Sequence, residues 1–444
     1  MRRVSDFIVW SVWAVMLLAA LACIARWGRN IPLAEDWLMV PALTGHEPSI
    51  PDWLWAQNNE HRVALPKLVY LGLLFITADF RSGMVVSALL LAALSAALIL
   101  AARRIRGGTV SITDVVFPVA LLHIGNWENL VWGWQLQFVL SVALTGTILV
   151  AMVRDPLPTR TTLATAAVAL LLLPLSGANG LILTLALAPW MLAAAAGRRH
   201  ADRWGSRLAI AAACMAVALV ALYFVDYARP TWNPPSPGPV ATVKTGLKVV
   251  GFGFGPAVNG RWLVAVAAAA AVTLPAFFLA ARLAVRPDGT GPDRIRAFGV
   301  TSFLGGMAVL ALAIGWGRAA GMVATNVLPD RYALLSVPAL IAAYLVLELY
   351  APRNWGAAGQ AALAGAFVLL LPFNTEAGFR WRDWYVAGMQ RVENDLADGV
   401  PRDALASRHR AFLLHWNEEL LRNDLALLRT AGIGPFARLR EGAQ

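Results

Sequence analysis

Runs of apolar residues, separated by short polar or charged segments, recur along the whole chain. A helix needs about 20 mainly apolar residues to cross the hydrocarbon core of a bilayer, and on this length the pattern predicts about eleven transmembrane helices. The sequence therefore predicts an all-α polytopic membrane protein. The predicted spans lie near residues 7–27, 82–101, 112–125, 135–153, 159–175, 180–197, 208–226, 262–283, 296–316, 331–350 and 356–372.

Basic residues concentrate between alternate spans. The segments "RRIRGG", "RDPLPTR", "GRRHADRWGSR" and "RLAVRPDGTGPDRIR" carry most of them, and the positive-inside rule assigns such loops, with the N-terminus, to the cytoplasm. Residues 64–80 are apolar enough to cross, but counting them as a span would move these loops outside. We therefore expect 64–80 to form a helix in the outer interface, or a re-entrant one.

This topology predicts three large outer segments, 28–81, 227–261 and the tail. Loop 227–261 starts with a Pro-rich stretch and continues into a predicted interfacial amphipathic helix with Lys244 and Lys248 on one face. The tail predicts two amphipathic helices separated by Gly399 and Pro401. The predicted organisation is a multi-span domain, 1–372, and an extracytoplasmic helical cap, 373–444.

Composition supports a membrane protein and excludes a soluble globule. Of the 444 residues, 59% are hydrophobic and 14% charged, which is too little charge to cover a soluble core. The net charge of +11 is explained by cytoplasmic arginine loops, so no nucleic-acid partner is expected. Cys23 and Cys214 both lie in apolar runs and indicate neither a disulfide framework nor a metal cluster.

The first candidate chemical group is the acidic pair Glu35 and Asp36 in "PLAEDWL", shortly after the first span. Loop carboxylates are commonly just solvated charge. The alternative is a general base, because a carboxylate in a partly dry groove can take the proton from an attacking hydroxyl.

The second candidate is "NNEHR", which contains Asn59, Glu60, His61 and Arg62. Such a row is typical of a buried network that fixes a loop. It is also suited to orienting a polyhydroxylated substrate, with the Arg62 guanidinium binding a phosphate.

The third candidate is "NWENLVWGWQ", with Trp127, Glu128, Asn129 and Gln135. Tryptophans at a membrane interface serve as anchors, but an acid and an amide at that depth are costly unless they are paired. The mixture of ring faces and polar groups is typical of carbohydrate sites.

The fourth candidate is "GRAAGMVATNVLPDRY", with Arg318, Asp330, Arg331 and Tyr332. Arginines on the predicted outer side require an anionic partner, either an acid such as Asp330 or a lipid phosphate. The two lysines of the predicted amphipathic helix raise the same question. The chain has no P-loop, dinucleotide-binding glycine pattern, zinc-protease motif or nucleophile elbow.

The order of these features resembles the GT-C fold of membrane glycosyltransferases, including a bacterial branch of multi-span proteins grouped with that fold. The strings "AEDW", "NEHR", "WENLVWGWQ" and "DRY" carry the resemblance. It implies a polyprenyl-phosphate sugar donor, a glycan or lipid acceptor, and an acidic base that maps onto Asp36 or its neighbour Glu35. It also implies a multi-pass protein of the bacterial inner membrane that acts on its extracytoplasmic face, in the cell envelope.

The same resemblance implies that no nucleotide or other cofactor is required. A divalent cation held by Glu35 and Asp36 is compatible with it. Two other functions are open. A transporter or flippase for lipid-linked glycans predicts polar residues throughout the middle of the spans. A non-catalytic membrane assembly protein predicts that Asp36 can be lost without consequence.

Overall fold

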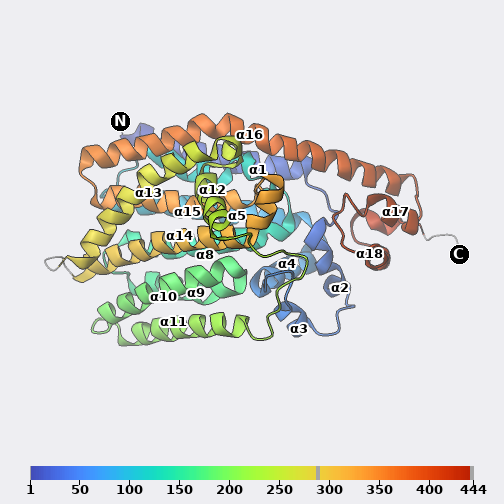
Figure 1. Ribbon diagram of the computed structural model, residues 1–444, viewed down its shortest axis with the longest axis horizontal. Coiled ribbons are helices and arrows are strands. Elements are labelled where there is room, and N and C mark those ends of the chain that lie inside the picture. The colour runs from blue at the N-terminus through green and yellow to red at the C-terminus, as the bar shows by residue number, and fades with distance from the viewer. Residues whose placement is uncertain (1, 287–290, 441–444) are drawn as a thin grey trace.

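The computed structural model describes residues 2–286 and 291–440. Its long helices lie side by side along the long axis of the molecule (Figure 1). Over the described residues there is no β-strand, only two isolated bridges. The prediction of an all-helical chain is therefore confirmed.

The transmembrane core is a bundle of long apolar helices. Among the described residues, nine helices are long and apolar enough to cross a membrane, as expected of a polytopic membrane protein. They are α1 (Arg2–Trp27), α5 (Arg81–Ile105), α8 (Leu136–Arg154), α10 (Ala178–Arg198), α11 (Arg203–Tyr223), α13 (Trp262–Val285), α14 (Gly291–Thr325), α15 (Tyr332–Tyr350) and α16 (Arg353–Ala397).

Two predicted spans differ from the structure. Residues 159–175 form a shorter apolar helix, α9 (Arg160–Leu172), that continues into the 3₁₀ turn η5 (Leu173–Ser176). Residues 112–135 form a series of short pieces: η2 (Ile112–Val115), α6 (Val116–Leu122), η3 (Ile124–Asn126), α7 (Trp127–Leu130) and η4 (Gly133–Gln135).

The broken segment is tolerated because protein surrounds it. Residues 116–140 are all buried, and irregular backbone in a membrane protein is stable only where protein or water satisfies it. Apolar composition alone does not distinguish such a segment from a lipid-facing span.

The loop after α1 forms one end of the bundle, which we call the cap end. Its helices are η1 (Ala34–Met39), α2 (Val40–Leu43), α3 (Ile50–Trp55) and α4 (Ala64–Thr77). Helix α4 is the expected helix at 64–80. Its 14 residues give roughly 21 Å, less than a bilayer core. Figure 1 places α2–α4 together at this end.

Helix α12 (Pro239–Gly251) differs from the predicted surface helix, because it packs closely on α14. A Cβ atom added at Gly315 would lie 2.4 Å from the Thr242 carbonyl oxygen, so this crossing requires a glycine. Lys248 is buried and its Nζ donates to the Asn326 carbonyl (2.8 Å), whereas Lys244 is exposed. The two lysines lie one helical turn apart on α12, as predicted, but they do not form a common solvent-exposed face.

The tail also differs from its prediction. Helix α16 runs without a break across residue 373, the predicted domain boundary. In place of the second predicted tail helix, the structure has two helices, α17 (Arg402–His409) and α18 (Glu418–Thr430). The 3₁₀ helix η8 (Gly434–Arg438) follows them. Figure 1 shows α16 extending beyond the bundle toward α17 and α18 at the cap end.

The tail docks directly on the acidic loop. The Ala34 N–H donates to the Leu413 carbonyl (2.8 Å). The buried Trp37 ring contacts His415 and Phe436, with ring centroids 5.7 and 6.2 Å apart. The tail therefore fixes the position of the segment that carries the acidic pair.

A polar network closes the opposite end of the bundle, the base end. The Arg106 guanidinium donates to Asp114 (2.7 Å) and Glu348 (2.7 Å) and to the Tyr344 hydroxyl (3.1 Å). Gln360 donates to Glu348 (2.8 Å). We call these five residues the base clasp. It ties the end of α5 to η2, α15 and α16.

Candidate functional site

The acidic pair lies on the 3₁₀ helix η1, held against η8 and the segment that connects α17 to α18. Successive residues of a 3₁₀ helix are rotated by about 120°. Neighbouring side chains on η1 therefore point in different directions, and Glu35 and Asp36 have different surroundings.

Asp36 points into the protein. Its side chain is buried, and Oδ2 accepts a hydrogen bond from the Leu33 N–H (3.2 Å). Oδ1 has no hydrogen-bond partner in the described part of the chain. Burial raises the pKa of Asp36 to about 8, although the Leu33 and Trp134 amides and the Tyr70 hydroxyl favour the charged form. The carboxyl group is therefore mostly protonated at neutral pH.

Glu35 points toward a group of charged side chains. It is half-buried, and its Oε1 lies 3.5 Å from Asn59 Nδ2. Burial raises the pKa of Glu35. The charges of Arg331 and Arg318 act against this shift, and that of Glu60 adds to it.

The "NNEHR" segment forms a tight turn that reaches this group. Asn58 and His61 exchange two backbone hydrogen bonds, of 2.7 and 2.9 Å, so Asn59 and Glu60 form the tip. Asn59 has a φ of 52°, a left-handed conformation that asparagine tolerates better than most residues. The tip directs Asn59 toward Glu35, and Glu60 forms an ion pair with Arg318.

Arg62 anchors this turn and does not join the group. Its guanidinium donates to the backbone carbonyls of Trp55 (2.8 Å), Tyr223 (3.0 Å) and Val225 (2.8 Å). Because all three nitrogens are engaged with backbone, the geometry does not support Arg62 as a phosphate ligand. For this residue the loop-fixing interpretation is the correct one.

His61 lies beside Glu60, with Nε2 3.8 Å from Glu60 Oε1. Burial is the main reason that the pKa of His61 is lowered to about 4; the Glu60 charge opposes this shift, and the charges of Arg318 and Arg331 contribute to it. The imidazole is therefore neutral at pH 7. Its Nδ1 is buried and has no hydrogen-bond partner over the residues described.

Two arginines complete the group. Arg318, near the end of α14, donates from Nε to the buried Tyr332 hydroxyl (2.5 Å) and from Nη2 to Glu60. Arg331 donates from its backbone N–H (3.1 Å) and Nη1 (3.3 Å) to Glu128 Oε2.

Buried polar groups of "WENLVWGWQ" hold Arg331 in place. Asn129 Nδ2 donates to the Arg331 carbonyl (3.1 Å), and the guanidinium lies 5.9 Å from the centroid of the Trp132 ring. Glu128 and Arg331 thus provide each other's charge partner at a buried position. Asp330, the partner considered from the sequence, makes no ion pair with Arg331 among the contacts of the described residues.

We call these side chains the carboxylate–arginine cluster. Its members are Glu35, Asn59, Glu60, His61, Glu128, Asn129, Arg318, Arg331 and Tyr332.

Other residues singled out from the sequence make no direct contact with the cluster among those recorded for the described residues. Trp127 is buried against Trp27, with ring centroids 5.9 Å apart. Gln135 is buried, and its Oε1 lacks a hydrogen-bond partner in the described residues. Lys244 is exposed on α12, and Lys248 is bonded to backbone.

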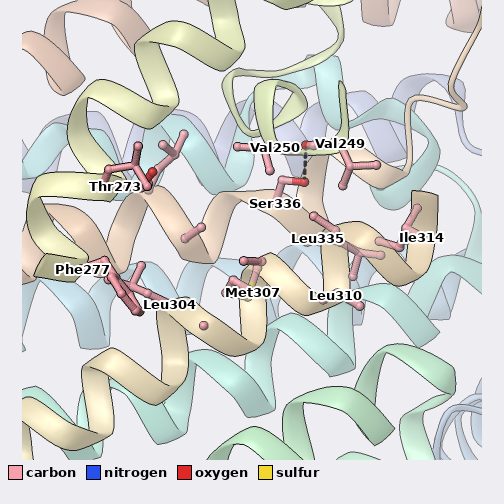
Figure 2. Close-up of a pocket in the computed structure, with 16 residues that line it drawn as sticks. Val249, Val250, Thr273, Phe277, Leu304, Met307, Leu310, Ile314, Leu335 and Ser336 are labelled. Atoms are coloured by element: carbon pink, nitrogen blue, oxygen red, sulfur yellow. Dashed lines mark hydrogen bonds between the residues drawn. The ribbon is translucent and has the colours of Figure 1, made fainter. Parts of the chain in front are cut away.

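An apolar groove of about 280 Å³ lies between α12, α13, α14 and α15. Figure 2 shows side chains of these helices bordering it. Its two hydroxyl groups are already bonded: Ser336 donates to the Val249 carbonyl (2.6 Å) and Thr273 to the Ala269 carbonyl (2.8 Å). The lining therefore offers a hydrocarbon surface.

The groove ends next to the two arginines. Ile314 lines it and precedes Arg318 by four residues on α14. Leu335 also lines it and follows Arg331 by four residues at the start of α15. Residues four apart on a helix share a face and are about 6 Å apart along the axis. Each arginine is thus one helical turn from the groove.

A second cleft, of about 450 Å³ and with a mainly apolar lining, includes residues of the segment before α15. Asp330, Asn259, Trp381 and Trp384 are among its lining residues. Burial raises the pKa of Asp330 to about 7, and the Glu128 charge adds to the shift. The sequence did not predict this cleft: it predicts an amphipathic helix from Arg382 onward, which contains Trp384 but does not indicate a cleft.

The acidic pair does not fit a divalent cation. The carboxylates of Glu35 and Asp36 have separate surroundings. Across the described residues, no group of three or more His, Cys, Asp or Glu side chains is arranged to hold a metal ion. No chemical step is therefore assigned to a metal.

No protein-family model, curated protein or solved structure matches this chain.

Proposed function

We propose that the protein is a membrane glycosyltransferase that moves a sugar from a polyprenyl-phosphate donor to a hydroxyl group of a glycan or lipid acceptor. One observation carries this proposal. Glu35, an acid whose pKa is raised by burial, faces Arg318 and Arg331, and each arginine lies one helical turn from an apolar groove. An acid, two cations and a hydrocarbon surface are the parts that such a donor and reaction require.

The groove and the arginines suit the donor. An isoprenoid chain in the groove would bring its phosphate to the ends of α14 and α15. Arg331 has two nitrogens, Nε and Nη2, that make no hydrogen bond within the described part of the chain. Charge-assisted hydrogen bonds from these N–H groups would hold the phosphate oxygens.

Glu35 suits the role of general base. Its carboxylate takes the proton of the acceptor hydroxyl as that oxygen attacks the anomeric carbon, and the bond from that carbon to the phosphate oxygen breaks. The electron pair leaves with polyprenyl phosphate, and the cations of Arg318 and Arg331 stabilise the charge that develops there. The charges of Arg331 and Arg318 lower the pKa of Glu35 against the effect of burial and so favour the ionised form that accepts a proton.

This assignment moves the base from Asp36, the residue favoured by the resemblance, to Glu35. Asp36 is buried and mostly protonated at neutral pH, so it is poorly suited to accept a proton. Asn59 contacts Glu35, and Glu60 lies between His61 and Arg318. Their polar groups, with a neutral His61, would supply hydrogen-bond partners for hydroxyl groups of the transferred sugar.

The test is transfer by the purified protein in nanodiscs supplied with radiolabelled polyprenyl-phosphate hexose and an envelope lipid extract. We expect labelled product and release of polyprenyl phosphate, both lost in Glu35→Gln. The matched control is Glu419→Gln, the same change at an exposed position on α18. Donor binding without product or polyprenyl-phosphate release in the wild type would overturn the proposal in favour of a lipid-binding or transport protein.

A further inference from the structure

A cavity of about 890 Å³ opens at the base end, between α5, α8, α14 and α15. It lies at the opposite end of the bundle from Glu35, and neither the groove nor the cluster shares a residue with it. Its charged lining consists of four arginines and two carboxylates: Arg103, Arg104, Arg154, Arg296, Asp155 and Glu348.

The two carboxylates leave positive charge in the cavity uncompensated. Glu348 is already bound by Arg106 and Gln360 of the base clasp. Asp155 pairs with Arg104 (2.8 Å) and more distantly with Arg154 (3.9 Å). The cavity therefore has an excess of cations that an anion would balance.

Arg103 contributes most clearly to this excess of positive charge. Its Nε donates to the Gly108 carbonyl (3.2 Å), and it has no acidic partner within the described residues. Its side chain is exposed at the end of α5. An exposed arginine whose charge is not balanced by an acid is well placed to contact a bound phosphate.

Arg296 supplies a second, independent observation. Its side chain is only 13% exposed, and Nη2 bonds to Asp293 (2.7 Å). Its Nε is buried and has no hydrogen-bond partner over the described residues. Arg296 therefore adds a largely buried positive charge to the wall of the cavity.

The cavity also has an apolar wall that continues onto the side of the bundle. Ala97, Leu100 and Ala101 of α5 and Val150 of α8 line it. Leu100 is 51% exposed and lies one helical turn from Arg103 and Arg104. The occupant therefore needs an anionic part against the arginines and an apolar part along the helices.

We propose that this cavity binds an anionic phospholipid, with its phosphodiester against Arg103, Arg154 and Arg296 and its acyl chains along α5 and α8. Basic pockets between transmembrane helices are known to bind anionic head groups. The lipid would join four helices at the base end and so stabilise the folded state through binding. This inference does not depend on the proposed transferase function.

The test compares lipids added to the purified full-length protein in detergent. We expect phosphatidylglycerol to raise the thermal denaturation midpoint by about 3 °C or more, as ligand linkage predicts, and to remain bound in native mass spectrometry. Phosphatidylcholine should do neither. Equal stabilisation by both lipids would overturn the proposal. Full stabilisation by inorganic phosphate alone would also overturn it, in favour of a soluble-anion site.

Variants locate the effect. Arg103→Gln combined with Arg154→Gln should raise the phosphatidylglycerol concentration for half-maximal stabilisation about tenfold or more. The control pair is Arg203→Gln with Arg207→Gln, the same charge change on exposed arginines that do not line the cavity. Equal losses in both pairs would refute the site. If the first pair does not fold, Arg103→Gln alone, which breaks no ion pair, gives the same test.

Discussion

The base clasp and the carboxylate–arginine cluster are polar networks at opposite ends of one bundle. In the clasp, Asp114 is fully buried and accepts hydrogen bonds from Arg106, the Tyr344 hydroxyl and the Ser111 N–H. Glu348 is held by two donors. All three guanidinium nitrogens of Arg106 are in use.

The cluster is incompletely paired. Glu35 has one long contact with Asn59 (3.5 Å). Arg331 uses one of its three guanidinium nitrogens, and His61 Nδ1 is buried without a partner in the residues described. Satisfied networks rigidify a fold, whereas unsatisfied groups with shifted pKa values gather where a ligand completes them. Incomplete pairing distinguishes a candidate site from a structural joint more clearly than charge does.

The largest expected effect is a loss of stability when the base clasp is broken. Asp114→Ala leaves the Arg106 guanidinium with one fewer carboxylate at a mostly buried position. Breaking a buried ion pair in this way costs about 3–5 kcal/mol, so the denaturation midpoint should fall sharply. Transfer per folded molecule should not change. A double change, Asp114→Leu with Arg106→Met, should recover part of the stability, and failure to recover any would contradict the pairing argument.

The next effect is expected at the cluster and is catalytic. Glu35→Gln keeps the size and hydrogen bonding of the side chain but removes the base. We expect sugar transfer to fall by on the order of a hundredfold or more, with little change in the denaturation midpoint, because no close ion pair is broken.

Asp36→Asn is the variant to compare with Glu35→Gln, because it makes the same change at the other acid of the pair. Since Asp36 is mostly protonated at pH 7, a neutral amide of the same shape should lower transfer only a few-fold at that pH. Transfer rates of the two variants, measured on equally folded protein, separate the two acids. A hundredfold loss in Asp36→Asn with activity retained in Glu35→Gln would return the base to Asp36.

A smaller effect is expected for donor binding. Arg331→Gln should raise the donor concentration for half-maximal transfer about tenfold, since a charge-assisted hydrogen bond to phosphate is lost. It also leaves Glu128 buried without its ion partner. Adding Glu128→Gln should restore stability but not donor affinity. Recovery of both would mean that Arg331 acts only as a structural partner of Glu128.

The sequence predicted the helical bundle and the segments that form the cluster. Apolar length identified the long helices, and the clustering of polar residues identified Glu35, Glu60 and Glu128. It did not predict the broken segment 112–135, because protein-covered and lipid-covered apolar residues look alike in a sequence. The continuity of α16 past residue 373 was missed for a related reason, since a helix can leave the membrane without a change in backbone.

The sequence could not predict which side chains of the site form ion pairs and hydrogen bonds with one another. Arg331 pairs with Glu128 and not with its neighbour Asp330. Glu128 is about two hundred residues away in the chain, and only the tertiary fold brings the two side chains together. Arg62 is engaged by backbone carbonyls, which carry no sequence signal. The orientations of the Glu35 and Asp36 side chains depend on the 3₁₀ geometry of η1, which the neighbouring residue types do not indicate.

The smallest effect concerns Asp330, an acid that belongs to neither network. Burial raises its folded-state pKa to about 7, above the unfolded value of about 4. The folded state therefore binds this proton more tightly, and stability falls as pH rises from about 4 to about 7. Asp330→Asn removes the group that ionises, so this part of the decline should disappear. Denaturation midpoints at pH 5 and pH 8 should therefore differ less in Asp330→Asn than in the wild type. Parallel pH profiles for the two proteins would show that Asp330 ionises normally, with a solvated or internally paired carboxylate.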